Sequence, residues 1–491
     1  MSKIKNFEKI SLNFHLKHPG KGNEPSDPNA IFYINGIYHL HYILRHKWNG
    51  TNHNKPRNNF PFLHSHSFIH VTSKDMINWK WNETKLQPSF TKHGMFSGTG
   101  FITFDHKPAI IYHGENTKKN FIIIAKNNNL SKWYNPFPIQ LISNKKKTKI
   151  KLWDPDCFII DKTYYSISGG IEQTLFKSNN LKNWKHIGKF MKSDLRNVEI
   201  GEDISCPNFF KLKNKWVLLC ISHSHGCRYY IGDWNRKTEK FIPHTHERMN
   251  WPNYSDSKFE IENRDFFAPE SVKTPDGRRV MWSWMRMQGI KNLNILSLPR
   301  ELDISPKGKL IIKPANELKK LRSNPKVLKN VKIKPSNNPL NIFPIKPIIL
   351  LKESSLEIEI LIKKKQLKQK RFGFKIFSKK KEGGFPIIFQ PDSETIFVGN
   401  TQAPFNLGDI ENTKYLKVRI FVDKFLIEVF VGDIQSVVGS YFDFKKNNYF
   451  SAFSFGSSLL IDTIKIWHMK SVNLGYQKAQ KNKIWKIDEK N

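Results

Sequence analysis

The segment GEDISCPNFF, Gly201–Phe210, places two carboxylic acids, a serine and a Cys-Pro pair within ten residues. Three interpretations fit this composition. The segment is the wall of an active site with Glu202 or Asp203 as its acid, a site that has lost its acid, or an ordinary strand with a polar entrance. Other carboxylates stand in PSDPNA (Asp27) and WDPDCF (Asp154). The choice depends on whether the fold brings these segments together.

Alternating strand-like runs joined by turns recur along the first 300 or so residues. INGIYHLHYI is followed by FIHVTSKDMINWKW, PAIIYHG by FIIIAKNNNLSKW, DKTYYSISGG by TLFKSNNLKNWKHIG, and NKWVLLCIS by YYIGDWNRKTEKF. Each of these units carries a tryptophan, at intervals of roughly 50 residues (Trp79, Trp133, Trp184, Trp234). RRVMWSWM and NILSLPREL continue the series as a fifth unit. All-strand repeats of this length predict a five-bladed β-propeller, whose innermost strands point side chains into one funnel.

The pattern divides the chain into four parts. We expect the propeller over residues 8–310. Residues 311–344 are rich in Lys, Asn and Pro and predict a linker with one short helix near Ala315–Leu321. Alternating runs from SLEIEILI to LLIDTIKIWHM predict a second all-β unit, a β-sandwich, over 345–470. The polar segment 471–491 is expected to be mobile or helical.

The composition is strongly basic, with 81 Lys and Arg against 42 Asp and Glu and a formal net charge of +39. Such a charge suits a nucleic-acid binder. Basic runs such as Lys363–Lys365 are, however, scattered between apolar segments, which favours solvated surface lysines and no specific nucleic-acid partner. Four cysteines are too few for a disulfide scaffold. Neither a secretory signal nor a membrane-spanning run is visible, so we expect a cytoplasmic protein that makes no membrane contact; its oligomeric state is left open.

The order of the motifs resembles glycoside hydrolase family 32, the β-fructosidases, over nearly the whole chain. The shared motifs are PSDPNA, FSGTG (Phe96–Gly100), WDPD, SCPNFF, DFFA (Asp265–Ala268) and LPREL. No single match is specific, but their order and spacing are. The resemblance implies a propeller followed by a sandwich, and retaining hydrolysis of fructosides without a cofactor.

Residue roles also follow from the resemblance. Asp27 matches the family's nucleophile and Asp154 its transition-state stabiliser. The alternative is that Asp27 has only a structural role, in an Asx turn. Asp156, two residues further on, shares the face of Asp154 in a regular strand and is a lower-ranked sugar contact. The expected substrate-binding residues are Asn29, Phe96, Ser97, Trp153 and Ser205.

The family's acid, a glutamate, falls on Ser205, and serine cannot act as an acid near neutral pH. Asp203 lies two residues earlier and shares a face with Ser205 in a regular strand. Glu202 points to the opposite face unless a bulge turns it inward. Both can instead cap the strand entrance, and the sequence does not decide. If neither is the acid, Glu270 in FFAPES is the next candidate.

Further departures from the family pattern are Ser26, Ala30, Ile43 and Trp153, each at a position expected to touch the sugar. They predict a rewritten pocket. The leading function is hydrolysis of sucrose or a fructo-oligosaccharide. The alternatives are hydrolysis or transfer on another furanoside, a non-catalytic sugar-binding protein on the same scaffold, and a basic nucleic-acid scaffold.

Two His-x-His pairs, His64 with His66 and His244 with His246, have the one-face spacing of metal ligands. Companion ligands at metal spacing are not obvious, and fructoside hydrolysis needs no metal. We therefore predict no metal site and take these histidines as contacts of sugar or solvent.

Overall fold

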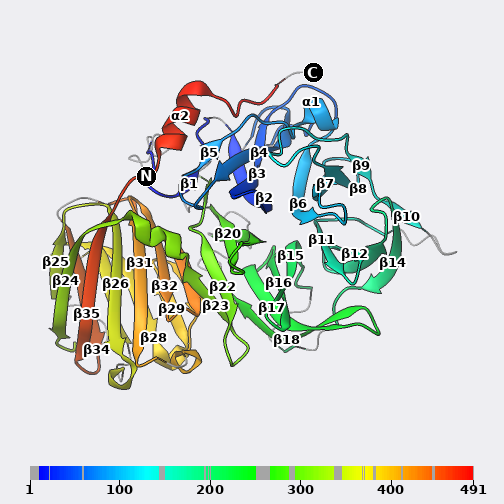
Figure 1. Ribbon diagram of the computed structural model, residues 1–491. Helices are drawn as coiled ribbons and strands as arrows, with labels where there is room; N and C mark the ends of the chain where they lie inside the picture. The colour runs from blue at the N-terminus through cyan, green and yellow to red at the C-terminus, as the bar shows by residue number, and fades with distance from the viewer. Residues whose placement is uncertain are drawn as a thin grey trace.

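The structure is a computed structural model. It describes residues 10–489 except 22, 58–59, 143–149, 193–194, 197, 199–200, 250–265, 287–293, 337–345, 368, 370, 380–382, 411–412 and 445–447. As predicted, these residues are almost entirely strands and turns, arranged in two lobes (Figure 1). None of the helices in this described part is long and apolar enough to cross a membrane.

The described residues of the N-terminal lobe form five mainly antiparallel sheets. The first contains β2 (Glu24–Ile34), β3 (Ile37–Lys47), β4 (His64–Ser73) and β5 (Lys80–Trp81). The second contains β6 (Met95–Ile102), β7 (Pro108–Gly114), β8 (Lys119–Ile124) and β9 (Phe137–Pro138), and the short helix α1 (Pro88–Thr91) precedes it. The third contains β11 (Pro155–Ile160), β12 (Thr163–Ser168), β13 (Thr174–Ser178), β14 (Asn183–Lys189) and the parallel edge strand β10 (Gln140–Ile142).

The remaining two sheets complete this lobe. The fourth contains β15 (Ser205–Leu212), β16 (Lys215–Ser222), β17 (Gly226–Asn235) and β18 (Lys240–Arg248). The fifth contains β1 (Leu16–Lys17), β19 (Phe267–Lys273), β20 (Arg279–Arg286), β21 (Asn294–Leu296), β22 (Arg300–Ile304) and β23 (Leu310–Pro314).

The first strands of the five sheets lie at the centre of the lobe. In chain order β2, β6, β11, β15 and β19 each contact the next, and β19 contacts β2 again, so they form a closed ring. β1 pairs with β21 of the last sheet, with Leu16 opposite Leu296, and this pairing joins the start of the ring to its end. Radial sheets around such a ring are the arrangement of a β-propeller (Figure 1).

The repeated tryptophans stabilise the outer turns of these sheets. The indole N–H groups of Trp133 and Trp184 donate to the backbone carbonyls of Leu130 and Leu181, three residues earlier. Both leucines have a left-handed backbone, with φ of 57° and 63°. A buried indole that holds a strained turn explains why tryptophan recurs at this point of the repeat.

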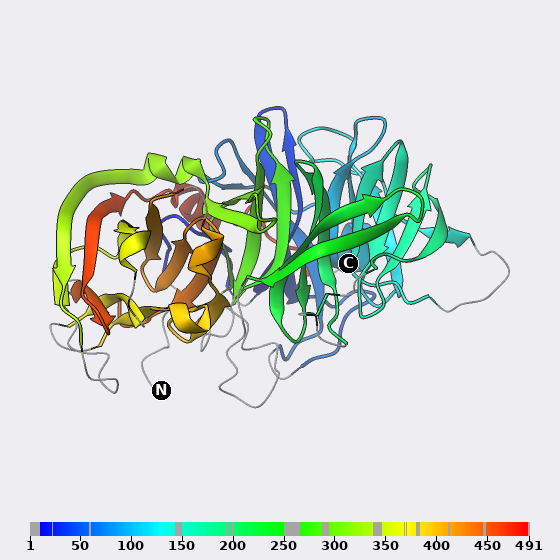
Figure 2. The same ribbon diagram turned by 90° about the horizontal axis from the view of Figure 1, so that it is seen from below.

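The C-terminal lobe is a sandwich of two six-stranded sheets, which Figure 2 shows beside the propeller. One contains β24 (Arg322–Ile333), β26 (Ser355–Lys363), β31 (Tyr415–Asp423), β32 (Leu426–Val431), β33 (Gln435–Ser440) and β35 (Leu459–Met469). The other contains β25 (Lys346–Leu351), β27 (Arg371–Ser378), β28 (Phe385–Gln390), β29 (Thr395–Val398), β30 (Thr401–Pro404) and β34 (Asn448–Phe455). Their facing apolar side chains, among them Ile358, Phe374 and Val429, form the largest apolar core among the described residues. Short 3-10 turns η4 (Lys364–Gln366), η5 (Pro391–Ser393) and η6 (Leu407–Asp409) join some of the strands.

The segment 311–344, for which the sequence predicts a linker, is largely ordered strand in its described part. The expected short helix is present as the 3-10 helix η3 (Asn316–Leu321). The following strand, β24, pairs along its length with β35 and belongs to the sandwich. It is an edge strand, and the lysines that suggested a linker are exposed there, as charged residues at sheet edges commonly are. Residues 337–344 lie outside the described part.

The polar segment 471–491 crosses back to the propeller in its described part. It forms helix α2 (Leu474–Asn482), which packs on β5. Beyond the helix, Trp485 is buried against the ring of His18, with ring centroids 4.4 Å apart. The Gln87 amide donates to Asp488 at 3.0 Å. The tail is therefore a structural part of the first sheet's surroundings.

Candidate functional site

Most innermost strands are irregular near their first residues, at the centre of the propeller. Register shifts interrupt β2 after Pro25, β6 after Met95, β15 after Ser205 and β19 after Phe267. Bulges of this kind re-aim side chains and are common beside active sites. Asp27, Phe96 and Ser97 lie within these irregularities, whereas Asp154 directly precedes β11, which pairs with β12 in regular register.

Asp27 lies within the first register shift of β2, between Pro25 and Pro28, and is half-buried. Its carboxylate accepts a hydrogen bond from Ser97 Oγ of β6 at 3.2 Å. Asn29 is buried and braces this turn, because its amide donates to the Asp27 carbonyl at 3.0 Å and accepts from the Gly98 N–H at 2.8 Å. Asn29 thus fixes the position of Asp27 and does not face open space.

Asp154 immediately precedes β11 and faces the same centre. Its Oδ2 accepts the backbone N–H of Cys206 at 3.0 Å. Cys206 has a left-handed backbone, with φ of 47°, and this conformation turns its N–H toward the carboxylate. The Cys206 sulfur lies 3.7 Å from Asp154 Oδ2 and 3.8 Å from Asp27 Oδ2. The two aspartates predicted to act together therefore flank one thiol.

Burial, reinforced by the negative charge of Asp154, raises the pKa of Asp27 to about 6, although the Ser97 hydroxyl opposes this shift. Burial also raises the pKa of Asp154, against the Cys206 N–H and the charges of His113 and His223. Burial and the two carboxylates raise the pKa of the Cys206 thiol well above its ordinary value. The thiol is thus a neutral S–H donor between two carboxylates.

Aromatic side chains form one wall beside these carboxylates. The Trp153 ring lies 5.6 Å from that of His113, and Phe96 lies 6.4 Å from His113 and 4.5 Å from His66. Trp153 has 48% of its surface exposed. An exposed indole at the rim of a polar site offers an apolar face on which a sugar ring can stack. The sequence did not predict that His113 and His66 would form a wall with Trp153.

Asp156 does not lie open to a ligand. It is 2% exposed, and its two oxygens accept Thr99 Oγ1 at 2.6 Å and the Phe209 N–H at 2.7 Å. Asp156 therefore ties β6, β11 and β15 together, and the alternative interpretation as a sugar contact does not fit its burial.

Glu202 points away from the centre, as strand alternation predicts. Its fully buried carboxylate forms an ion pair with Arg228 and lies 3.7 Å from Arg248. The register shift of β15 comes after Ser205, so it does not turn Glu202 inward.

Asp203 and Ser205 share the opposite face. The buried Ser205 hydroxyl donates to Asp203 Oδ2 at 2.9 Å, so Ser205 bonds the carboxylate two residues before it. His223 contributes two more hydrogen bonds to Asp203, from its backbone N–H at 2.8 Å and its Nδ1 at 2.6 Å. Burial alone would raise the pKa of Asp203, but these hydrogen bonds lower it to about 2. Asp203 is a stably ionised carboxylate.

Comparison with known proteins identifies the chain. The sequence profile described as the glycosyl hydrolases family 32 N-terminal domain matches residues 19–314, and that of the family 32 C terminal matches residues 317–468. The protein belongs to glycoside hydrolase family 32. It is a glycosidase by this membership.

Relatives of this family 32 protein match nearly its whole length. The sucrose-6-phosphate hydrolase of Bacillus subtilis is 24% identical over 94% of this chain and 95% of its own. The structure of sucrose-6-phosphate hydrolase from Lactobacillus gasseri superposes with a TM-score of 0.71 at 20% identity, covering 95% and 94% of the two chains. That of fructan 1-exohydrolase IIa from Cichorium intybus gives 0.72 at 18% identity, covering 94% and 97%. The two structures share the propeller and sandwich fold.

Some positions at which this family 32 protein departs from the family pattern lie in its core. Ala30 and Ile43 belong to a buried cluster with Phe68 and Met95. They shape the packing behind Asp27 and do not line an open site. Asp265 of the DFFA motif lies outside the described residues.

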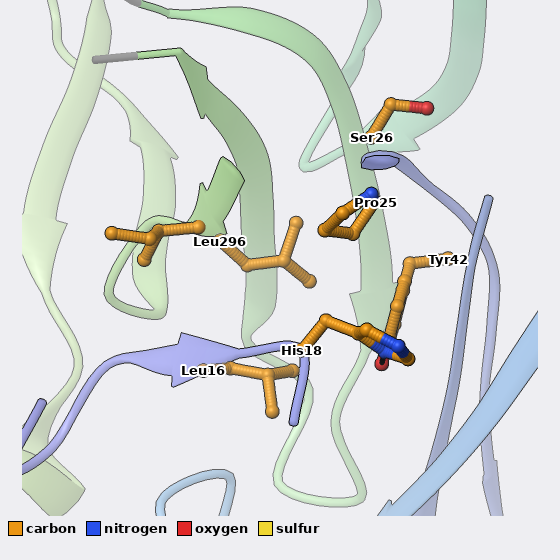
Figure 3. A pocket seen from close by; sticks show the side chains of 7 residues that line it. Leu16, His18, Pro25, Ser26, Tyr42 and Leu296 are labelled. Atoms are coloured by element: carbon orange, nitrogen blue, oxygen red, sulfur yellow. Dashed lines mark hydrogen bonds between the residues drawn. The ribbon is translucent and has the colours of Figure 1, made fainter. Parts of the chain in front are cut away.

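Ser26 lies beside a small cavity behind the Asp27 turn, lined also by Leu16, His18, Pro25, Tyr42, Ile295 and Leu296 (Figure 3). His18 Nδ1 and the Tyr42 hydroxyl are 2.7 Å apart, and the Trp81 indole donates to the same hydroxyl at 2.9 Å. Burial, with the charge of Lys17, lowers the pKa of His18 to about 3, so this imidazole is neutral. The cavity is part of the packing between the first and last sheets.

The His-x-His pairs have separate surroundings. His66 bonds Glu115 at 2.6 Å, whereas His244 bonds Asp233 at 2.8 Å near the surface. Among the described residues, no group of three His, Cys, Asp or Glu side chains is placed to hold a metal ion.

Proposed function

We propose that the protein is a β-fructofuranosidase that cleaves a terminal fructosyl unit with retention, with Asp27 as nucleophile and Asp154 as stabiliser. The observation that carries the proposal is the convergence of these two carboxylates on Cys206, with Ser97 and the Trp153 wall beside them. Retaining hydrolysis needs one ionised carboxylate beside the anomeric carbon. With a pKa of about 6, Asp27 is ionised at neutral pH.

The same arrangement distributes the remaining tasks. Asp154, held by the Cys206 N–H, is placed to hold sugar hydroxyls and to stabilise positive charge at the anomeric carbon. Ser97 keeps one Asp27 oxygen oriented. Trp153, which replaces the family's arginine before Asp154, supplies a stacking face in place of hydrogen bonds, and this is the proposed modification of the pocket.

The substrate is proposed from the names of the relatives and from the net charge of the protein. The relatives are named for sucrose-6-phosphate and for fructan. The protein as a whole is strongly basic, which favours an anionic ligand. A phosphorylated sucrose is therefore the first substrate to test, followed by sucrose and short fructans.

The test is release of fructose from sucrose-6-phosphate, sucrose and 1-kestose, followed by chromatography, with the first-formed anomer identified by NMR. Release as the β-anomer supports retention. Fructosyl oligomers formed from donor alone would indicate transfer instead of hydrolysis. A first-formed α-anomer would contradict the nucleophile assignment.

A second candidate function is sugar binding without turnover, and the specific observation in its favour is serine at the family's acid position. It predicts saturable binding of fructosides by calorimetry with no product after prolonged incubation.

We also propose the number of propeller blades and the bounds of the two domains. Each of the five sheets in the described N-terminal residues is one blade, which gives a propeller over about 8–310 and a sandwich that begins at β24. A cytoplasmic location remains a prediction.

A further inference from the structure

The proposed reaction needs a proton donor for the departing oxygen, and the usual carboxylic acid is absent. Ser205 stands in its place and is fully buried. Asp203 is nearest in sequence, but an ionised carboxylate that accepts hydrogen bonds from Ser205, Ser222 and His223 has no proton to give.

His223 lies at this position in space. It follows the last residue of β16 in the turn to β17, next to the first residues of β15 because Ser205 pairs with Ile221. Its Nδ1 lies 2.6 Å from Asp203 Oδ2 and 3.5 Å from Ser205 Oγ. The side chain is 43% exposed, so solvent and a ligand can reach it.

The surroundings of His223 suit a charged imidazole. Two carboxylates act on it: Asp203, before β15, bonds its Nδ1, and Asp154, before β11, interacts with its charge. Phe267 of β19 contributes an apolar contact, with ring centroids 6.1 Å apart. Because β19 is the innermost strand of the fifth sheet, this contact places the imidazole on the funnel side of the fourth sheet.

We propose that His223, oriented and charged by Asp203, is the general acid and base of this enzyme in place of the family's glutamate. This inference rests on the proposed fructosidase function. Asp203 is then a positioning residue, which fixes Nδ1 as the bonded nitrogen so that Nε2 exchanges the proton, as carboxylate–histidine pairs do in other hydrolases.

The reaction consumes only the fructoside and water, and its protons and electrons balance without another reagent. An Asp27 oxygen attacks the anomeric carbon, the bond from that carbon to the leaving oxygen breaks, and its electron pair takes the proton from His223 Nε2. In the second step neutral His223 removes a proton from water, whose oxygen bonds the anomeric carbon and displaces Asp27. Fructose is released and His223 is charged again.

Other candidate acids are less suitable. Glu270 is 3% exposed, and burial and the charge of Asp156 raise its pKa well above the ordinary value, so its carboxyl group is enclosed and out of reach of a ligand. Glu202 is engaged by Arg228 on the far face. His113 is buried, with Nδ1 2.9 Å from Asn120 Oδ1.

The test compares H223Q and D203N with wild type on two substrates. Sucrose has a basic leaving oxygen, whereas p-nitrophenyl β-fructofuranoside has one that leaves without a proton. H223Q is expected to lower kcat/KM on sucrose by about 10²–10⁴-fold and on the aryl fructoside by less than about tenfold. The matched control is H244Q, which removes the exposed His244–Asp233 pair of the same sheet.

Two further readouts separate catalysis from structure. The alkaline limb of the wild-type pH profile on sucrose is expected to vanish in H223Q and to move to lower pH in D203N, because the imidazolium loses its anionic partner. Added azide is expected to accelerate H223Q on the aryl fructoside and to form fructosyl azide, because azide attacks the intermediate without base assistance.

The possible outcomes separate the role of His223 from the proposed fructosidase function on which it rests. Active wild type with H223Q equally active on sucrose overturns the role of His223 and leaves the fructosidase proposal standing. Equal losses on both substrates, with no azide effect, also overturn it. Absence of turnover by the wild type on every fructoside removes the proposed function and the His223 role together.

Discussion

His15 Nδ1 lies 3.0 Å from Asp423 Oδ2, and its Nε2 lies 3.1 Å from Glu428 Oε1, so one imidazole joins the N-terminal segment to two carboxylates of the sandwich. The side chains of all three residues are completely buried. Arg300 of the propeller also bonds Glu428, at 2.7 Å. The contact between the two lobes therefore includes a buried charge network.

Because of this network, we expect the free energy of unfolding to decrease in mild alkali. Burial alone would lower the pKa of His15, but hydrogen bonds and charges of Asp423 and Glu428 raise it from 6.5 to about 8. The folded state thus holds the proton more tightly, and its stabilising contribution, about 2 kcal/mol, is complete below pH 6.5 and is lost as the pH rises through 8. Denaturant unfolding at pH 6 and pH 9 measures this difference, which His15→Gln should reduce. An unchanged difference in H15Q would contradict the assignment.

Replacing Asp27 by Asn is expected to abolish fructoside hydrolysis, by about 10⁴-fold or more, because the amide cannot form the covalent intermediate. Sugar binding measured by calorimetry should persist. The control is Asp233→Asn, which makes the same chemical change in β17, away from the site. Retention of more than about a tenth of wild-type activity by D27N would show that another group is the nucleophile.

The acid limb of the pH profile reports the Asp27 carboxylate. Because its pKa is raised to about 6, activity should decline as the pH falls through 6 and the nucleophile becomes neutral. The Ser97 hydroxyl stabilises the ionised form, so Ser97→Ala should move this limb to higher pH. Profiles of kcat/KM for both proteins make the comparison, and a limb shifted to lower pH would be the contrary result.

Trp153→Ala should weaken sugar binding more than it slows chemistry, because the indole offers a stacking surface and no reactive group. A loss of about 1 kcal/mol corresponds to a roughly fivefold rise in KM at similar kcat. Tyr134, with a similar exposed fraction of 49% but outside the site, gives the control Y134A. An unchanged KM would show that the indole does not contact the substrate.

Trp485→Ala should destabilise the propeller by about 3–5 kcal/mol, because a buried indole is removed from its contact with His18. The neighbouring Ile484 is 44% exposed, and I484A should change the free energy of unfolding by less than about 0.5 kcal/mol. Chemical denaturation compares the two. Equal stabilities would mean that the tail packs without contributing to the fold.

Sequence alone predicts the parts of this protein that repeat or alternate. The tryptophan interval and the alternating runs indicated sheets and turns because burial on a pleated surface imposes that pattern locally. The pairing of Asp27 with Asp154 came from the resemblance to family 32, together with the single funnel that the innermost strands of a propeller share. The sequence does not predict β24, because an exposed edge strand can carry lysines on both of its faces at little cost.

The charge relationships of the site were less predictable. His223 is remote from Asp203 in the chain, and only the hairpin register brings it back to the carboxylate. The available signal was ISHSHG, a histidine directly after the strand that neighbours GEDISCPNFF. Cys206 likewise gained its role from a backbone conformation that residue type does not reveal.

The pairing of β1 with β21 has a consequence for how the chain reaches this structure. Leu16 is among the first described residues, but its partner Leu296 is synthesised only after four sheets are complete. During translation the ring must remain open, because β1 has no pairing partner until β21 of the last sheet is made, and until then its edge is available to other chains. Such non-local closure makes folding slow and dependent on protection of that edge until the ribosome has delivered the last sheet.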